Sequence, residues 1–123
     1  MIDDRKKILV IDDEQDFLDL VRQRLQKFFQ VALARDGEEG LLAVDQFKPD
    51  LILLDINMPK LNGYGFLKKL RSRKESQFIP VIVLTTVGLT SSIFETEKMG
   101  AVDYIIKPVS LEELPELLQR RMY

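Results

Sequence analysis

Several residue types that carry chemistry in other proteins are missing from this chain. It has no cysteine, which excludes disulfides, thiolate zinc sites and cysteine nucleophiles. It has no histidine either, which excludes a Ser-His-Asp triad, histidine-ligated metals and a phosphohistidine on this chain. Any chemistry must therefore depend on carboxylates, hydroxyls, lysine and a hard metal ion.

Long hydrophobic runs and a strong charge of either sign are also lacking. The first apolar run, residues 8–11, is too short for a signal peptide or for a membrane span, which needs about 20 residues. We therefore expect a cytoplasmic protein without a membrane partner. The net charge of −2 does not favour nucleic acid or anionic lipid. The 123 residues suit one domain, residues 1–123, and we expect no output domain in this chain.

Short apolar runs alternate with longer amphipathic segments. The short runs predict strands at residues 8–11, 31–34, 51–54, 81–84 and 102–106. The first run is continuous and β-branched, which is typical of a buried strand, whereas residues 31–34 are a weaker example. The longer segments have helical apolar spacing, which predicts helices at residues 14–29, 38–47, 64–71 and 91–99 and a last helix from residue 110. This alternation predicts an α/β fold, a doubly wound five-stranded parallel sheet with helices on both faces.

Three positions bear on the stability of these helices. Gly40 lies inside the segment 38–47, where glycine costs about 1 kcal/mol relative to alanine. Ser110 and Glu113 have the spacing of a capping box and predict that the last helix starts there. Pro115 follows one turn later and has no backbone donor, so it should bend or delay that helix.

Polar residues lie at the ends of four predicted strands. Asp12 and Asp13 follow the first strand and Asp55 the third, while Thr85 and Lys107 follow the fourth and fifth. The carboxyl ends of parallel strands form the edge where ligands bind in such sheets. A single acid there is ordinary turn chemistry, but polar groups at four strand ends together indicate a site.

Clustered carboxylates repel one another and need positive charge nearby. Lys107 and a divalent cation with oxygen ligands, such as Mg²⁺, would supply it. An aspartate beside such cations can attack phosphorus, because they neutralise charge on the transferring group. The residues therefore predict an aspartyl phosphate as the covalent product.

Five short motifs, in order along nearly the whole chain, resemble those of response-regulator receiver domains. They are ILVIDD at residues 8–13, LLDINMP at 53–59, NG at 62–63, LT at 84–85 and YIIKP at 104–108. The resemblance implies the flavodoxin-like strand order 2-1-3-4-5 and a role in two-component signalling.

The resemblance also implies the roles of the acidic residues. Asp55 would accept the phosphoryl group. Asp12, Asp13 and Asp55 would hold Mg²⁺, together with the backbone carbonyl of Asn57. Mn²⁺ would be a possible substitute.

A conformational switch is implied by the same resemblance. Thr85 and Lys107 would contact the new phosphoryl oxygens. As Thr85 moves, Tyr104 would turn inward and change the face formed by helix four, strand five and helix five. The Lys107–Pro108 peptide is expected to be cis, as is usual in this family.

The phosphoryl donor must be external, because the chain has no histidine. The resemblance implies a sensor histidine kinase or a histidine phosphotransfer protein, and a small-molecule donor is the other possibility. A downstream effector protein or an output domain would read the switch.

Two residues depart from the family pattern. Thr86 stands where a small residue is frequent and would crowd phosphoryl access. Val87 cannot orient water, which predicts slow or intermediate self-dephosphorylation.

Three other functions are alternatives. A phosphatase of the haloacid dehalogenase type needs a second aspartate where this chain has Asn57. A flavodoxin-like FMN binder needs a phosphate-binding loop after the first strand, where this chain has the acids Asp12, Asp13 and Glu14. A phosphorylation-independent interaction module of the same fold is the third, and the complete set of acceptor residues argues against it.

Overall fold

The computed structural model describes residues 3–55, 63–85, 103–106 and 110–122, with the backbone alone at Thr85 and Ile106. Five parallel strands form one sheet in the order β2-β1-β3-β4-β5. They are β1 (Lys7–Ile11), β2 (Gln30–Ala34), β3 (Leu51–Asp55), β4 (Val81–Thr85) and β5 (Asp103–Ile106). The fold class and the strand order expected from the sequence are confirmed.

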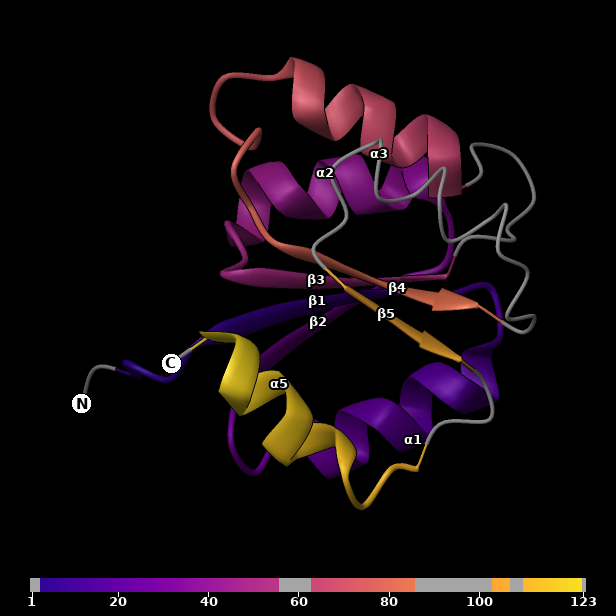
Figure 1. Ribbon diagram of the computed structural model, residues 1–123, viewed down its shortest axis with the longest axis vertical. Helices are drawn as coiled ribbons and strands as arrows, with labels where there is room; N and C mark the ends of the chain where they lie inside the picture. The colour runs from indigo at the N-terminus through magenta and orange to yellow at the C-terminus, as the bar shows by residue number, and fades with distance from the viewer. Residues whose placement is uncertain (1–2, 56–62, 86–102, 107–109, 123) are drawn as a thin grey trace.

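Helices cover both faces of the sheet (Figure 1). α2 (Gly37–Phe47) and α3 (Gly63–Ser72) lie on one face, and α1 (Gln15–Leu25) and α5 (Leu114–Met122) lie on the other. The helix predicted at residues 91–99 falls outside the described residues. Among the described residues, no helix has the length and apolar character to cross a membrane.

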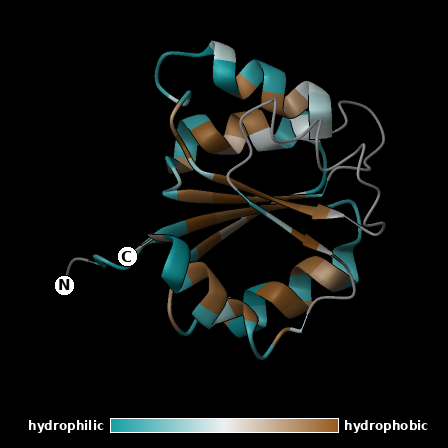
Figure 2. Cartoon of the chain, viewed as in Figure 1, coloured by the Kyte–Doolittle hydropathy of each residue, from teal (hydrophilic) through white to brown (hydrophobic). Residues whose placement is uncertain are grey.

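Alternate residues of the central strands contribute to two separate core layers. Ile8 and Val10 of β1 pack in the layer beneath α1 and α5, whereas Leu9 and Ile11 pack in the layer beneath α2 and α3. Because both faces are covered, the strands are hydrophobic along their length, as Figure 2 shows. This is why continuous apolar runs identified them in the sequence.

Gly40 lies where α2 packs against β1. A Cβ atom at this position would lie 2.6 Å from Cδ1 of Ile11 and 3.0 Å from Cε1 of Phe66. An alanine here would gain the helix propensity that glycine lacks, but it would require its neighbours to move.

α1 ends earlier than the sequence predicted. The helix stops at Leu25 instead of residue 29, and the backbone N–H groups of Phe28 and Phe29 both donate to the Leu25 carbonyl, at 2.9 and 3.0 Å. This turn leads the chain back to β2 and buries Phe29, which is 1% exposed. Both phenylalanines match the helical spacing of α1, but only Phe29 reaches the core, and it does so from outside the helix.

α5 begins later than predicted, at Leu114 instead of Ser110. Pro115 has no N–H to donate to the carbonyl of Leu111, which interrupts a regular helix from Ser110. The Leu111 carbonyl instead accepts a hydrogen bond from Nε of Arg24 on α1, at 3.2 Å. The expected delay of the helix by Pro115 is confirmed, whereas the start at Ser110 is wrong.

Candidate functional site

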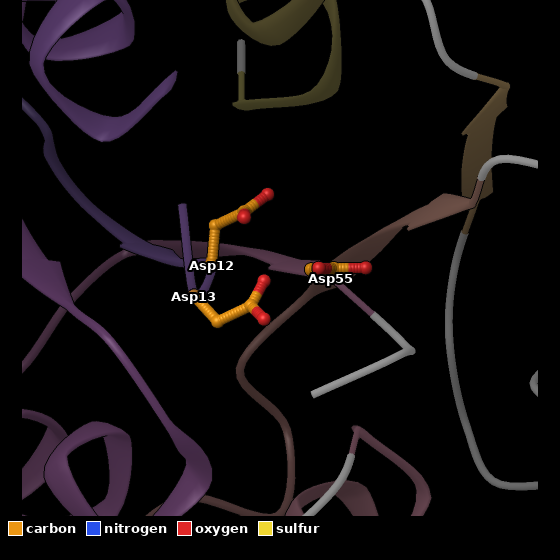
Figure 3. Close-up of side chains that lie close together, drawn as sticks. All are labelled: Asp12, Asp13 and Asp55. Atoms are coloured by element: carbon orange, nitrogen blue, oxygen red, sulfur yellow. The ribbon is translucent and has the colours of Figure 1, made fainter. Parts of the chain in front are cut away.

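The acidic residues singled out in the sequence come together at the carboxyl edge of the sheet (Figure 3). Asp12 and Asp13 directly follow β1, and Asp55 is the last residue of the neighbouring strand β3. Ile11 pairs with Leu54, so the register brings Asp12 and Asp55 to the same level. One carboxylate oxygen from each of the three aspartates lies within 4.8 Å of the other two.

Two of these carboxylates are buried and the third is exposed. Asp12 has 0% and Asp55 5% of its surface exposed, whereas Asp13 faces solvent. The N–H of Asp12 donates to the Ala34 carbonyl at 3.0 Å, and its Oδ1 accepts from the N–H of Glu14 at 3.0 Å. Asp12 is thus held between β2 and the start of α1. Buried carboxylates this close together need positive charge near them.

The three oxygens fit a hard divalent cation. Mg²⁺ binds oxygen at about 2.1 Å in octahedral geometry, so ligands on opposite sides of the ion are about 4.2 Å apart. The limit of 4.8 Å between the aspartate oxygens requires only a small side-chain adjustment, or a water in place of one direct bond. Exposure of Asp13 leaves room for the waters that Mg²⁺ retains.

β4 brings another of the predicted residues next to Asp55. Leu84 pairs with Asp55, and Thr85 follows Leu84 as the last residue of β4, where its backbone is described. The remaining predictions fall outside the described residues: Asn57, Thr86, Val87, Lys107 and the Lys107–Pro108 peptide.

Tyr104 lies on β5 and is 36% exposed. Its Cα pairs with that of Val83, two residues before Thr85. The next residue, Ile105, packs with the core layer beneath α1 and α5, so Tyr104 faces the other side of the sheet. The aromatic ring is therefore on the α3 side of the sheet.

An ion pair that sequence reasoning missed joins β5 to α5. The guanidinium of Arg121 pairs with the carboxylate of Asp103, which also accepts the backbone N–H of Tyr104 at 2.8 Å. Asp103 and Arg121 are 18 residues apart and carry no local sequence signal. The only available hints were an acid at the start of a predicted strand and a base at the end of a predicted helix.

A family model for the response regulator receiver domain matches residues 8–119, a range that includes all three aspartates of the cluster. The chain belongs to this family. The receiver is 43% identical over 111 residues to the probable transcriptional regulator ycf27 of Cyanophora paradoxa, which covers 89% of this chain and 45% of that relative. It thus spans less than half the length of this curated relative.

Solved structures of receivers are similar as well. The Vibrio cholerae chemotaxis protein CheY4 superposes with a TM-score of 0.89 at 32% identity, covering 94% of this chain and 98% of CheY4. The phosphorylated cyanobacterial phytochrome response regulator RcpA superposes with a TM-score of 0.79 at 30% identity, covering 95% of this chain and 91% of RcpA. The family and the fold agree with the resemblance drawn from the motifs.

Proposed function

We propose that this receiver is a phosphorylation-activated signalling switch in which Asp55 accepts the phosphoryl group. The observation that carries the proposal is the cluster of Asp12, Asp13 and Asp55, whose oxygens lie within 4.8 Å of one another in a receiver domain. Asp55 ends a strand with paired neighbours on both sides, so its backbone is held in place. The phosphorylated state of the similar protein RcpA supports the same chemistry here.

The acidic residues divide two tasks. Asp12 and Asp13, together with Asp55 and the backbone carbonyl of Asn57, would hold Mg²⁺ or Mn²⁺. The bound cation supplies charge neutralisation for the phosphoryl oxygens. A carboxylate oxygen of Asp55 attacks the phosphorus of a phosphohistidine on a sensor kinase or a phosphotransfer protein. The Asp55 O–P bond forms as the P–N bond breaks, and the donor's imidazole is the leaving group.

The change in charge at Asp55 then alters the surface around β5. Phosphorylation adds about −1.5 to −2 charge and new acceptor oxygens. Thr85 and Lys107 turn toward these oxygens, and Tyr104, now 36% exposed, moves inward. The resulting α4-β5-α5 face, in which α4 is the helix that the sequence predicts at residues 91–99, is read by an effector protein or by an output domain. The phosphoryl group is transferred to Asp55 of the receiver itself. Its removal by self-dephosphorylation is slow, because Val87 cannot orient the attacking water.

The test combines Mg²⁺ with an acyl-phosphate donor or with beryllofluoride, a phosphoryl mimic. Intact mass spectrometry and amide NMR compare the wild type, Asp55→Asn and the control Asp45→Asn. Asp45 is an exposed aspartate on α2, outside the cluster. The expected result is one Mg²⁺-dependent phosphoryl adduct in the wild type and in the control, and none in Asp55→Asn.

Two further outcomes separate the alternatives. Amide shifts that spread from Asp55 to Thr85 and Tyr104 support the switch. A folded wild type that binds Mg²⁺ but forms no adduct and shows no such shifts contradicts the proposal. That result would favour a phosphorylation-independent interaction module.

A further inference from the structure

The last residue of β1 faces a glycine on α2. Gly40 lies four residues after the N-cap Asp36, and its nearest neighbours across the layer are Ile11 and Phe66, both 0% exposed. A Cβ atom on Gly40 would lie 2.6 Å from Cδ1 and 3.4 Å from Cγ1 of Ile11, and 3.0 Å from Cε1 of Phe66. Favourable contacts between carbon atoms are about 3.5–4.0 Å, so any side chain at residue 40 must displace Ile11.

Ile11 has little freedom to move aside. Its χ1 angle is restricted because it is β-branched. Rotation about χ2 can turn Cδ1, but the side chain is fully buried in a closely packed layer, so the turned methyl group would meet other core atoms. Its backbone is paired on both sides, with Ala34 of β2 and Leu54 of β3. Crowding of the side chain is therefore transmitted to the end of β1 or to α2.

A movement of the end of β1 and a movement of α2 would each affect Asp12. This aspartate directly follows Ile11, and its N–H donates to the Ala34 carbonyl at 3.0 Å. If α2 moved away instead, it would pull on its N-cap, Asp36, which lies two residues after Ala34 at the end of β2. In either case the strand ends that hold the backbone of Asp12 would shift, and the carboxylate would shift with it.

We infer that Gly40 and Ile11 form a size-matched pair that positions Asp12 for cation binding. Gly40 is a positioning residue and not a ligand: its lack of a side chain admits the tip of Ile11 and allows α2 to pack closely against β1. The inference rests on the proposed function, because Mg²⁺ binding at Asp12 is what the pair would support.

The experiment uses a four-protein cycle of wild type, Gly40→Ala, Ile11→Val and the double variant. Valine lacks Cδ1, the atom that a Cβ at residue 40 would meet at 2.6 Å. Mg²⁺ affinity is measured by NMR titration of the Asp12 and Asp13 amides, and urea unfolding is measured on the same samples. The control Leu118→Ala removes a buried side chain from α5 on the other face of the sheet.

Gly40→Ala should weaken Mg²⁺ binding at least about threefold. Loss of a group that orients a metal ligand typically weakens binding by about 10- to 100-fold, and we expect a smaller effect here. The double variant should bind Mg²⁺ with the same affinity as Ile11→Val, because valine lacks the atom that the new Cβ would meet. Leu118→Ala should be less stable but should bind Mg²⁺ normally. Unchanged binding by Gly40→Ala, an equal loss in Leu118→Ala, or a double variant that binds more weakly than Ile11→Val would each overturn the inference.

Two other outcomes are also decisive. If Gly40→Ala does not fold, the double variant is compared with Ile11→Val: equal affinities support the size-matched pair, and a weaker double variant refutes it. If the folded wild type binds no Mg²⁺, the proposed function fails together with the positioning role. If the wild type binds Mg²⁺ but the four proteins do not differ as expected, the positioning role is refuted and the proposed function still stands.

Discussion

Removing the exposed carboxylate of the acidic cluster should change stability in opposite directions with and without Mg²⁺. Asp13→Asn keeps the size of the side chain and removes one negative charge beside the two buried carboxylates of Asp12 and Asp55. Without a cation, the loss of repulsion should stabilise the fold. With Mg²⁺ present, the loss of a ligand should reduce the stabilisation that the ion provides.

The distance between the oxygens sets the size of the first effect. Two unit charges 4.8 Å apart repel by about 1 kcal/mol in water and by about 3.5 kcal/mol at an effective dielectric constant of 20. Asp13 is exposed, so the lower value applies to its interaction with each of its two neighbours. Asp13→Asn should therefore raise the free energy of unfolding by about 1–2 kcal/mol in the absence of divalent cations.

Linkage sets the size of the second effect. A ligand present at 100 times its Kd stabilises the native state by about 2.7 kcal/mol. If Asp13→Asn weakens Mg²⁺ binding by about 100-fold, the increment at the same Mg²⁺ concentration falls to about 0.4 kcal/mol. The wild type should thus gain much more from Mg²⁺ than the variant.

Urea unfolding in chelator and in excess Mg²⁺ measures both effects. The matched control is Glu75→Gln, which removes an exposed carboxylate from the turn before β4, at the opposite edge of the sheet. This control should show the wild-type Mg²⁺ increment. The reasoning is refuted if Asp13→Asn is less stable than the wild type in chelator, or if its Mg²⁺ increment is undiminished.

Three further predictions concern hydrogen bonds outside the cluster. Asp36→Ala removes the N-cap of α2, a 2.8 Å bond from the N–H of Glu39, and should cost about 1 kcal/mol in urea unfolding, whereas an asparagine should restore most of the stability. Arg71→Lys should cost about 1–3 kcal/mol in the same assay, because one guanidinium nitrogen donates to carbonyls of the loop before β4, at 2.6 and 3.1 Å, and lysine cannot reproduce this geometry; an unchanged urea midpoint would contradict it. Hydrogen bonds from Arg5 lower the pKa of Asp3 from 3.8 to about 2. The contribution of the Asp3–Arg5 interaction to the stability of the fold is therefore complete above pH 3.8 and is lost as the pH falls through about 2. Carboxyl NMR titration should show this low pKa, and Asp3→Asn should flatten that part of the stability profile.

Local sequence patterns were sufficient for the strands and for the acidic cluster. The runs at residues 8–11, 51–54 and 81–84 are continuous and apolar because helices cover both faces of the sheet, so the pattern follows directly from burial. Asp12, Asp13 and Asp55 could be grouped in advance because parallel strands place their carboxyl ends at one edge. These features depend on the order of residues along the chain, and the sequence alone determined them.

Contacts between distant segments decided the rest. Phe28 and Phe29 match the spacing of α1, yet a turn at Leu25 directs the chain to β2, which no local pattern shows. The start of α5 depends on Pro115 and on Arg24, which takes the place of the missing donor to the carbonyl of Leu111 from another helix.

Gly40 shows the same division at a single residue. Helix propensity, a local property, favours alanine there by about 1 kcal/mol. A Cβ at residue 40 would lie 2.6 Å from Cδ1 of Ile11, 29 positions earlier in the sequence, so an alanine there requires the Ile11 side chain to move. The sequence by itself determined which segments are strands and which acids end them, because burial and the alternation of strands and helices produce local patterns of apolar residues. Only the tertiary structure decided where helices end and which side chains fit, because those depend on atoms brought together by folding.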